Sequence, residues 1–207
     1  MPSAPLHKPA RADGRRLRSE RTRKLVIEAY LALLRENPRV PTAVQVAERA
    51  GYSVRSVFER FPDLHALRIA ATDYAFGLAN DQTLTEGSDG NRQGRLKAHV
   101  ERRARICTLW LPLWRALNAN KGDSEELETR VRFIREATVR RIELFYRPEL
   151  STMTEIERRQ TVVAIDSLID FESWARMREF FGLSFEEACN LWIRTIDRLL
   201  PPTPADS

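Results

Sequence analysis

The sequence is poor in the residues that make turns. Only 8 of its 207 residues are glycine, and proline is concentrated towards the two ends. An all-β sandwich or barrel needs many turns between short strands, so this composition excludes one. The longest charge-free apolar run, residues 106–114, is about half of a membrane span, and the first 20 residues contain no apolar segment of a secretory signal. We therefore expect a cytoplasmic protein with no membrane segment.

Residues that commonly hold metals or attack substrates are also scarce. The two cysteines, Cys107 and Cys189, make no disulfide framework, and the three histidines have no metal-ligand spacing. The sequence has neither a nucleophile elbow nor a glycine-rich phosphate loop. We expect no catalytic residue, no metal site and no cofactor. A helical enzyme that binds a small molecule is the less favoured alternative.

Positive charge is unevenly distributed along the chain. The formal net charge is +5, yet residues 1–24 alone carry eight Lys/Arg against two acidic residues. Residues 25–68 have a surplus of one positive charge, which leaves the remaining body slightly acidic. A basic front on an acidic body is typical of a nucleic-acid-binding end, but a solvated tail carries the same charge. Charge alone leaves both interpretations open.

Hydrophobic spacing indicates helices throughout the chain. From about Ser19 onwards apolar residues recur at i, i+3, i+4 and i+7, and no segment alternates with the period of a strand. Residues 1–18 lack this period, and we expect them to form a disordered basic arm. The predicted fold class is all-α. Beyond residue 62 we expect helices over about 63–81, 94–109, 110–119, 124–147, 152–181 and 185–200, with Pro112 at a break.

Two short helices follow the first long one and carry the signals of a helix-turn-helix motif over residues 43–62. Thr42 and Ser53 are placed to cap these helices, and Gly51 stands at the turn between them. Ala47 is small enough to let the two backbones cross closely. In such a motif the second helix enters the major groove of DNA.

This region resembles the tetracycline-repressor-like (TetR/AcrR) family of bacterial transcriptional regulators in two segments, "TRKLVIEAYLALL" and "PTAVQVAERAGYSVRSVFERFPDLHAL". With the helix boundaries above, the resemblance implies a three-helix DNA-binding domain over 19–64 and a helical ligand-binding and dimerisation domain over 65–207. It also implies a homodimeric repressor whose C-terminal domain binds a small molecule and whose last two helices form the dimer interface.

The candidate DNA-binding residues lie on the second short helix and at the two caps. Arg55 and Arg60 can read guanine, although both could simply be solvated. Phe58 is expected to be shared between the core and the sugar-phosphate backbone. The full set is Thr42, Ser53, Val54, Arg55, Ser56, Phe58 and Arg60. In the arm, Arg15, Arg16 and Arg18 could reach the adjacent groove or contribute only nonspecific charge.

The C-terminal part offers candidates for a dimer interface and a pocket. Residues 152–181 are apolar on more than one face, so we expect a partner chain to cover one of them. The interface candidates are Leu168, Leu191, Trp192 and Ile196. The pocket candidates, for which ordinary core packing is the alternative, are the aromatic residues Trp110, Trp114, Phe133, Phe145, Phe171 and Trp174. Asp166 and Asp170 either receive a cationic ligand or pair with arginines of 124–147.

These features together predict a sequence-specific DNA-binding regulator. We expect a repressor that binds a palindromic double-stranded DNA operator as a homodimer and is released by a small-molecule effector. The alternative is a nonspecific, nucleoid-type DNA-binding protein, which would show a steep salt dependence and little preference for one sequence.

Overall fold

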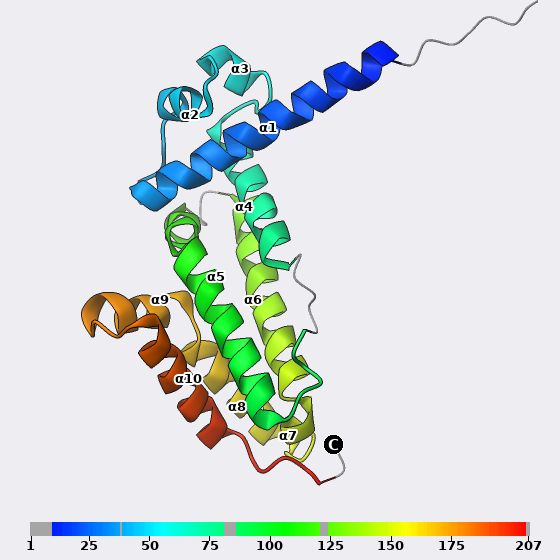
Figure 1. The fold of residues 1–207 in the computed structure, drawn as a ribbon, viewed down its shortest axis with the longest axis vertical. Helices are drawn as coiled ribbons and strands as arrows, with labels where there is room; N and C mark the ends of the chain where they lie inside the picture. Colours follow the sequence, from blue (N-terminus) through cyan, green and yellow to red (C-terminus); the bar gives the residue numbers. More distant parts are fainter. Residues whose placement is uncertain (1–9, 38, 81–85, 121–123, 206–207) are drawn as a thin grey trace, which may run out of the picture. The chain divides into compact units, whose positions relative to one another are not determined.

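The computed structural model describes residues 10–37, 39–80, 86–120 and 124–205. Those residues form helices and no strand, which confirms the predicted all-α class (Figure 1). The chain divides into two compact units, residues 1–74 and 75–207, and the boundary lies inside the helix α4 (Leu64–Asn80). The helices are α1 (Ala10–Glu36), α2 (Ala43–Ala50), α3 (Val54–Phe58), α4 (Leu64–Asn80), α5 (Arg92–Asn120), α6 (Glu125–Phe145), α7 (Arg147–Leu150), α8 (Glu155–Leu168), α9 (Phe171–Ala175), a turn of π-helix η2 (Arg176–Phe180) and α10 (Phe185–Leu199).

The first unit is built around one apolar face of α1. Its buried side chains recur with helical spacing, as Ile27, Tyr30, Leu31 and Leu34 do. Helices as short as α2 and α3 are unstable alone, so α2 depends on its contacts with α1 and α3 on its contacts with α2. Helix α2 contacts α1, Arg23 of α1 lies over the Phe61 ring, and the other buried apolar side chains of the unit include Val46, Val57, Phe61 and Leu67.

The start of α1 differs from the expected disordered arm. Helix is present from Ala10, so the prediction is wrong for residues 10–18, whereas residues 1–9 lie outside the described part of the chain. Local polar contacts support these turns. Arg16 Nε donates to Glu20 Oε1 over 3.1 Å, and Arg18 Nε donates to the Gly14 carbonyl over 3.0 Å.

The second unit is organised by α5. This helix runs without interruption through Pro112, so the predicted break between 94–109 and 110–119 is wrong. An interior proline removes one backbone hydrogen bond, and tertiary packing overrides that cost here. The helix contacts α6, α9 and α10, and its buried residues extend from Leu96 to Leu117 on either side of the proline.

The predicted helix over 152–181 is divided in the structure. It ends first at Leu168, and a new helix begins at Phe171. Asp170 causes the restart, because its side chain accepts a hydrogen bond from the Glu172 amide over 2.9 Å. The apolar residues continue across this point, so spacing alone hid the break.

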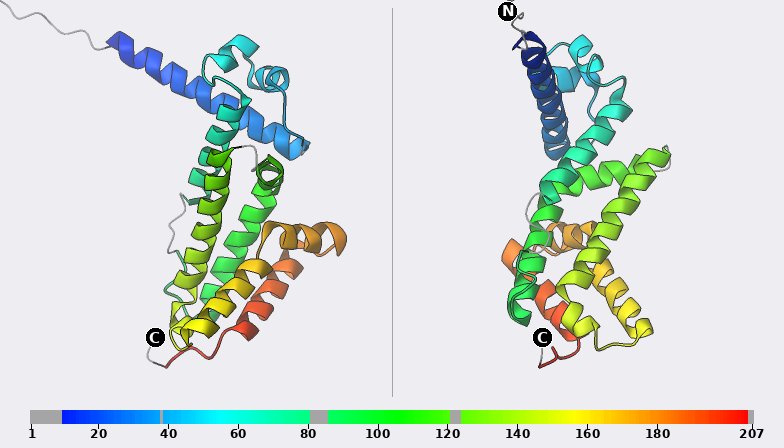
Figure 2. Two further views of the ribbon diagram at one scale, coloured as in Figure 1. Left: turned by 180° about the vertical axis from the view of Figure 1, so that it is seen from behind. Right: turned by 90° about the vertical axis from the view of Figure 1, so that its right-hand side faces the viewer.

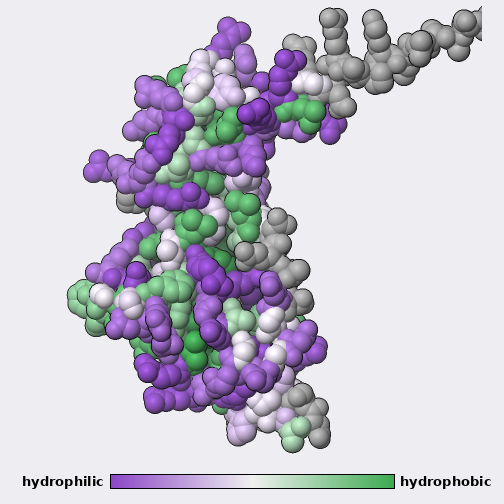
Figure 3. Space-filling model, viewed as in Figure 1, coloured by the Kyte–Doolittle hydropathy of each residue, from purple (hydrophilic) through white to green (hydrophobic). Residues whose placement is uncertain are grey.

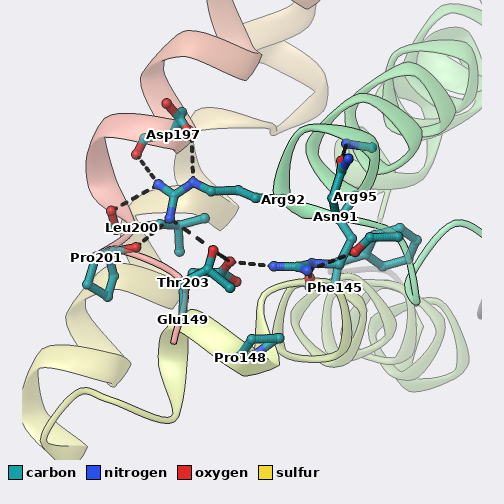
Figure 4. A network of polar contacts seen from close by, with 12 residues as sticks. Asn91, Arg92, Arg95, Phe145, Pro148, Glu149, Asp197, Leu200, Pro201 and Thr203 are labelled. Atoms are coloured by element: carbon teal, nitrogen blue, oxygen red, sulfur yellow. Dashed lines mark hydrogen bonds and ion pairs between the residues drawn. The ribbon is translucent and has the colours of Figure 1, made fainter. Parts of the chain in front are cut away.

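Arginines of α5 bind the carbonyl ends of other helices in the second unit (Figure 4). The last carbonyls of a helix have no partner within it, and a guanidinium can satisfy them. The bonds are Arg92 to the carbonyls of Asp197 in α10 and of Leu200 just after it (2.6 and 3.1 Å), Arg95 to Phe145 of α6 (2.9 Å), Arg102 to Ala79 of α4 (2.9 Å) and Arg103 to Ile169 just after α8 (2.8 Å).

The chain's C-terminal segment joins the same network. Glu149 is fully buried, and its Oε1 accepts hydrogen bonds from Arg95 and from the Thr203 hydroxyl. Arg92 adds an ion pair to Asp197, with Nε and Oδ1 2.7 Å apart. These contacts fasten the residues after α10 to the start of α5.

No helix in the described ranges combines the length and the hydropathy that a membrane crossing needs. The same ranges contain no group of three or more His, Cys, Asp or Glu side chains that could hold a metal ion.

Candidate nucleic-acid interface

The helix-turn-helix begins with a capping box at α2. Thr42 Oγ1 accepts a hydrogen bond from the Gln45 amide over 3.3 Å, and Gln45 Oε1 accepts one from the Thr42 amide over 2.9 Å. This reciprocal pair fixes where α2 starts. Thr42 itself is exposed at that end of the helix.

The turn between α2 and α3 depends on Gly51. Its φ is 73°, a left-handed conformation that side chains disfavour. The amide of Tyr52 then donates to the Ala47 carbonyl over 2.9 Å, which closes α2 and directs the chain into α3.

Helix α3 is short and has one buried side and one exposed side. Ser53 caps it, with Oγ accepting from the Ser56 amide over 3.1 Å. Val57 is 1% exposed and anchors the helix in the core, whereas Arg55 and Phe58 point outward. One buried anchor therefore holds a helix whose other side is available to a partner.

The structure brings the predicted DNA-binding residues of α3 and its caps to the surface of the first unit. Thr42, Ser53, Arg55 and Phe58 are exposed, and Val54, Ser56 and Arg60 are half-buried. Phe58 is 44% exposed, so Val57 rather than Phe58 fills the core below it. Hydrophilic residues cover most of the visible face of this unit (Figure 3).

The predicted arm residues have a different setting. Arg16 and Arg18 are exposed on the first turns of α1, which is helical there. The side chain of Arg15 lies outside the described part of the structure.

Glu59 was not among the predicted site residues, yet it controls the charges around α3. Arg55 Nε donates to Glu59 Oε1 over 3.2 Å, and Arg60 Nη1 lies 4.0 Å from Glu59 Oε2. The separation of four residues between Arg55 and Glu59 is a helical pairing signal that the sequence already contains. In the free protein the two candidate base-reading arginines therefore share one carboxylate.

The second unit contains a cavity of about 370 Å³ that involves only part of the predicted aromatic set. Trp114 and Phe171 line it, and their rings stack with centroids 4.8 Å apart. The other pocket candidates pack elsewhere: Trp174 against Trp192 (5.0 Å), Phe145 against His99 (5.1 Å), Phe133 against Phe76 (5.0 Å), and Trp110 in the core. Of the six aromatic pocket candidates, the structure therefore brings Trp114 and Phe171 to this cavity and does not bring the other four there.

Polar groups dominate the lining of this cavity. Asp166 and Asp170 both line it, and neither forms an ion pair with an arginine in the described ranges. Burial raises the pKa of the Asp166 carboxyl, while the positive charges of Arg103 and Arg135 offset part of that rise. Of the two roles considered for these aspartates, the structure favours facing the cavity.

The predicted interface residues separate into two groups. Trp192 and Ile196 are fully buried inside their own chain, so the prediction that they contact a partner is wrong. Leu168 is half-buried, and Leu191 is 38% exposed. Helices α8 and α10 lie side by side (Figures 1 and 2), and their exposed apolar residues are Ile156, Val163, Leu191 and Leu199.

No protein-family model matches the chain, and no curated protein matches its sequence. Several solved structures match its fold. One is a TetR-family transcriptional regulator from Streptomyces coelicolor, with a TM-score of 0.64 and 21% identity, covering 87% of this chain and 80% of that one. Another, from Rhodococcus sp. and described as a TetR-family transcriptional regulator, has a TM-score of 0.63 and 21% identity, covering 87% and 98%. The two units of this chain therefore have the all-α fold of the TetR-family transcriptional regulators.

Proposed function

We propose that the chain is a sequence-specific DNA-binding transcriptional regulator that reads an operator through α3. The observation that carries this proposal is the division of α3 between a buried anchor, Val57, and the exposed Arg55 and Phe58. A helix held this way can enter the major groove while its first residues meet base edges. The fold shared with TetR-family regulators supports the same role.

Charge and hydroxyl groups around α3 suit both parts of DNA recognition. Arginine can bind guanine O6 and N7 together, and serine can bind a base or a phosphate. Thr42 at the start of α2 and the basic first turns of α1 would add contacts to phosphates, which position the protein without reading sequence.

We propose further that the regulator acts as a homodimer through α8 and α10. Their exposed apolar side chains, with Val163 and Leu191 near the middle of the two helices, are what two copies would bury together. A two-fold dimer presents two α3 helices to successive major grooves about 34–36 Å apart, so the operator should be palindromic. A small molecule bound in the second unit would release it as a repressor.

The competing function is nonspecific DNA binding, which the basic first turns of α1 favour. Genomic fragments captured by the purified protein at near-physiological salt, then sequenced, distinguish the two. A discrete palindromic site supports the regulator, and its loss with Arg55→Ala assigns the reading to α3. Uniform recovery of fragments, with a steep dependence on salt, would replace the regulator by the nonspecific binder.

A further inference from the structure

The cavity in the second unit has a balanced set of charges. Its walls come from α5, α6, α8 and α9 with the segments next to them, and they include three arginines and three acidic residues. A ligand with a net charge of either sign would meet as many repelling as attracting groups in such a lining. The balance favours a ligand that carries both signs.

Most of these charges already have partners within the protein. Both carboxylate oxygens of Glu172 accept hydrogen bonds from Arg115, over 3.0 and 3.1 Å. Asp170 caps α9, and Arg103 donates to the Ile169 carbonyl while its guanidinium lies 4.7 Å from the centre of the Phe171 ring. These groups hold the walls in place and have little capacity left for a ligand.

Asp166, Arg135 and Arg176 are the exceptions, and Arg135 is the one of the two arginines that lies over the Trp114 ring. Within the described residues none of these three side chains makes a hydrogen bond or an ion pair; the Arg135 guanidinium lies 5.7 Å from the centre of the Trp114 ring, and its charge acts on Asp166. Asp166 is half-buried and therefore bears part of the cost of desolvation without a bonded cation. A carboxylate and a guanidinium thus lie in one cavity with their strongest bonding capacity unused.

We propose that this cavity binds a small zwitterion of the amino-acid type. Asp166 accepts hydrogen bonds from its ammonium group, Arg135 donates to its carboxylate, and the stacked Trp114 and Phe171 rings form the wall beside its carbon skeleton. Charge-assisted hydrogen bonds of this kind are the strong ones in a partly desolvated site.

The size of the cavity agrees with such a ligand. About 370 Å³ is near the lower end of the range for small-molecule sites, which begins at roughly 300 Å³. The role of this ligand as the effector rests on the regulatory function proposed above. Its binding to the free protein does not rest on that function.

Calorimetry on the full chain without DNA tests the proposal directly. The probes are the free L-amino acids, followed by the decarboxylated amine and the N-acetyl form of the tightest binder. Each derivative lacks one of the two charges, so each should bind about tenfold more weakly or worse. Asp166→Asn should weaken binding of the amino acid and of the amine by a similar factor and leave binding of the N-acetyl form unchanged. Arg135→Gln should show the opposite pattern.

Glu155→Gln, an exposed acid on the same helix outside the cavity, is the matched control and should change nothing. Failure of every amino acid to bind at millimolar concentration would overturn the proposal. So would an N-acetyl form that binds as well as its parent, or an Asp166→Asn variant that folds and binds normally. DNA binding of the same preparations is measured separately. A protein that binds the amino acid but fails to bind an operator would overturn only the proposed function.

Discussion

Arg55 and Glu59 face each other along α3, with Arg55 Nε donating to Glu59 Oε1 over 3.2 Å. The arginine side chain is 89% exposed, so the pair is a surface interaction and contributes little to stability. Its importance is electrostatic: an acidic group stands where phosphates and base edges would approach. In the proposed complex, DNA must separate this pair or tolerate its carboxylate before Arg55 can bind a base.

Removing that carboxylate should strengthen DNA binding. Glu59→Gln leaves Arg55 and Arg60 unpaired and takes away one repulsion, so we expect an affinity gain of about 0.2–1 kcal/mol at low salt. Arg55→Ala should instead lose about 1–3 kcal/mol, mainly on the cognate site. Fluorescence anisotropy with labelled duplexes measures both. Glu36→Gln removes the same charge from the end of α1, and an equal gain there would show that net charge alone is responsible.

Gly51→Ala should destabilise the first unit by about 1–2 kcal/mol, the usual cost of a left-handed residue with a side chain. The space around the residue is open, since an added Cβ would meet nothing within 4 Å. The cost therefore comes from the backbone conformation alone. Gly14→Ala, in α1 with equally open space and no positive φ, is the control and should be neutral or stabilising. Urea unfolding measures the two variants, and equal stabilities would refute the argument.

The proposed dimer should respond to substitution of the exposed residues of α8 and α10. Val163→Glu and Leu191→Glu place a charge on surfaces that are already 57% and 38% exposed, so each chain should fold and the dimer should dissociate. Sedimentation velocity gives the mass, and circular dichroism confirms the helices. Leu109→Glu tests a leucine of α5 whose exposure, 45%, lies between those two values, and it should leave association intact. A dimer that survives both substitutions would move the interface elsewhere.

Stability should fall as the solution becomes acidic, because of His99. Burial, reinforced by the charges of Arg103, Arg141 and Arg102, lowers the pKa of this imidazole from 6.5 to about 3. The unfolded chain therefore binds a proton between those values that the folded chain does not. Stability supplied by the neutral imidazole is present above pH 6.5 and is lost as the pH falls towards 3.

The pH dependence can be assigned with His99→Gln. One such histidine contributes a slope of up to about 1.4 kcal/mol per pH unit in this window, and the variant should lose that part of the slope. Urea unfolding at a series of pH values measures it, and NMR should show the His99 ring resonances constant down to about pH 4. Identical slopes in the two proteins would contradict the assignment.

The helix-turn-helix of the first unit could be predicted because its signals are local, whereas the helical start of α1 was missed. The two helix caps and the turn are formed by residues close together in the sequence, at Thr42, Ser53 and Gly51. Their geometry therefore depends little on distant contacts. The arginine pairing with Glu59 obeys the same kind of rule. Comparing the positions of all the charged residues on and beside α3 would have revealed the pair of Arg55 and Glu59 from the sequence.

The second unit was harder to predict because its outcomes depend on tertiary packing. A stripe of apolar residues shows that Trp192 and Ile196 are covered, but not whether their own chain or a partner covers them. Likewise, aromatic residues mark a core as readily as a pocket, and Trp174 belongs to the core. The cavity was instead marked by charged residues in an apolar stretch, Asp166 and Asp170.

The arginines of α5 have a consequence for how the second unit opens. Because one helix holds the carbonyl ends of α4, α6, α8 and α10, none of these ends can fray without breaking a bond to α5. Displacing α5 would expose all of them to solvent together. Hydrogen exchange in the native state should therefore show the amides of these helices opening as one cooperative block, with protection factors that change in parallel when Arg92 or Arg95 is removed.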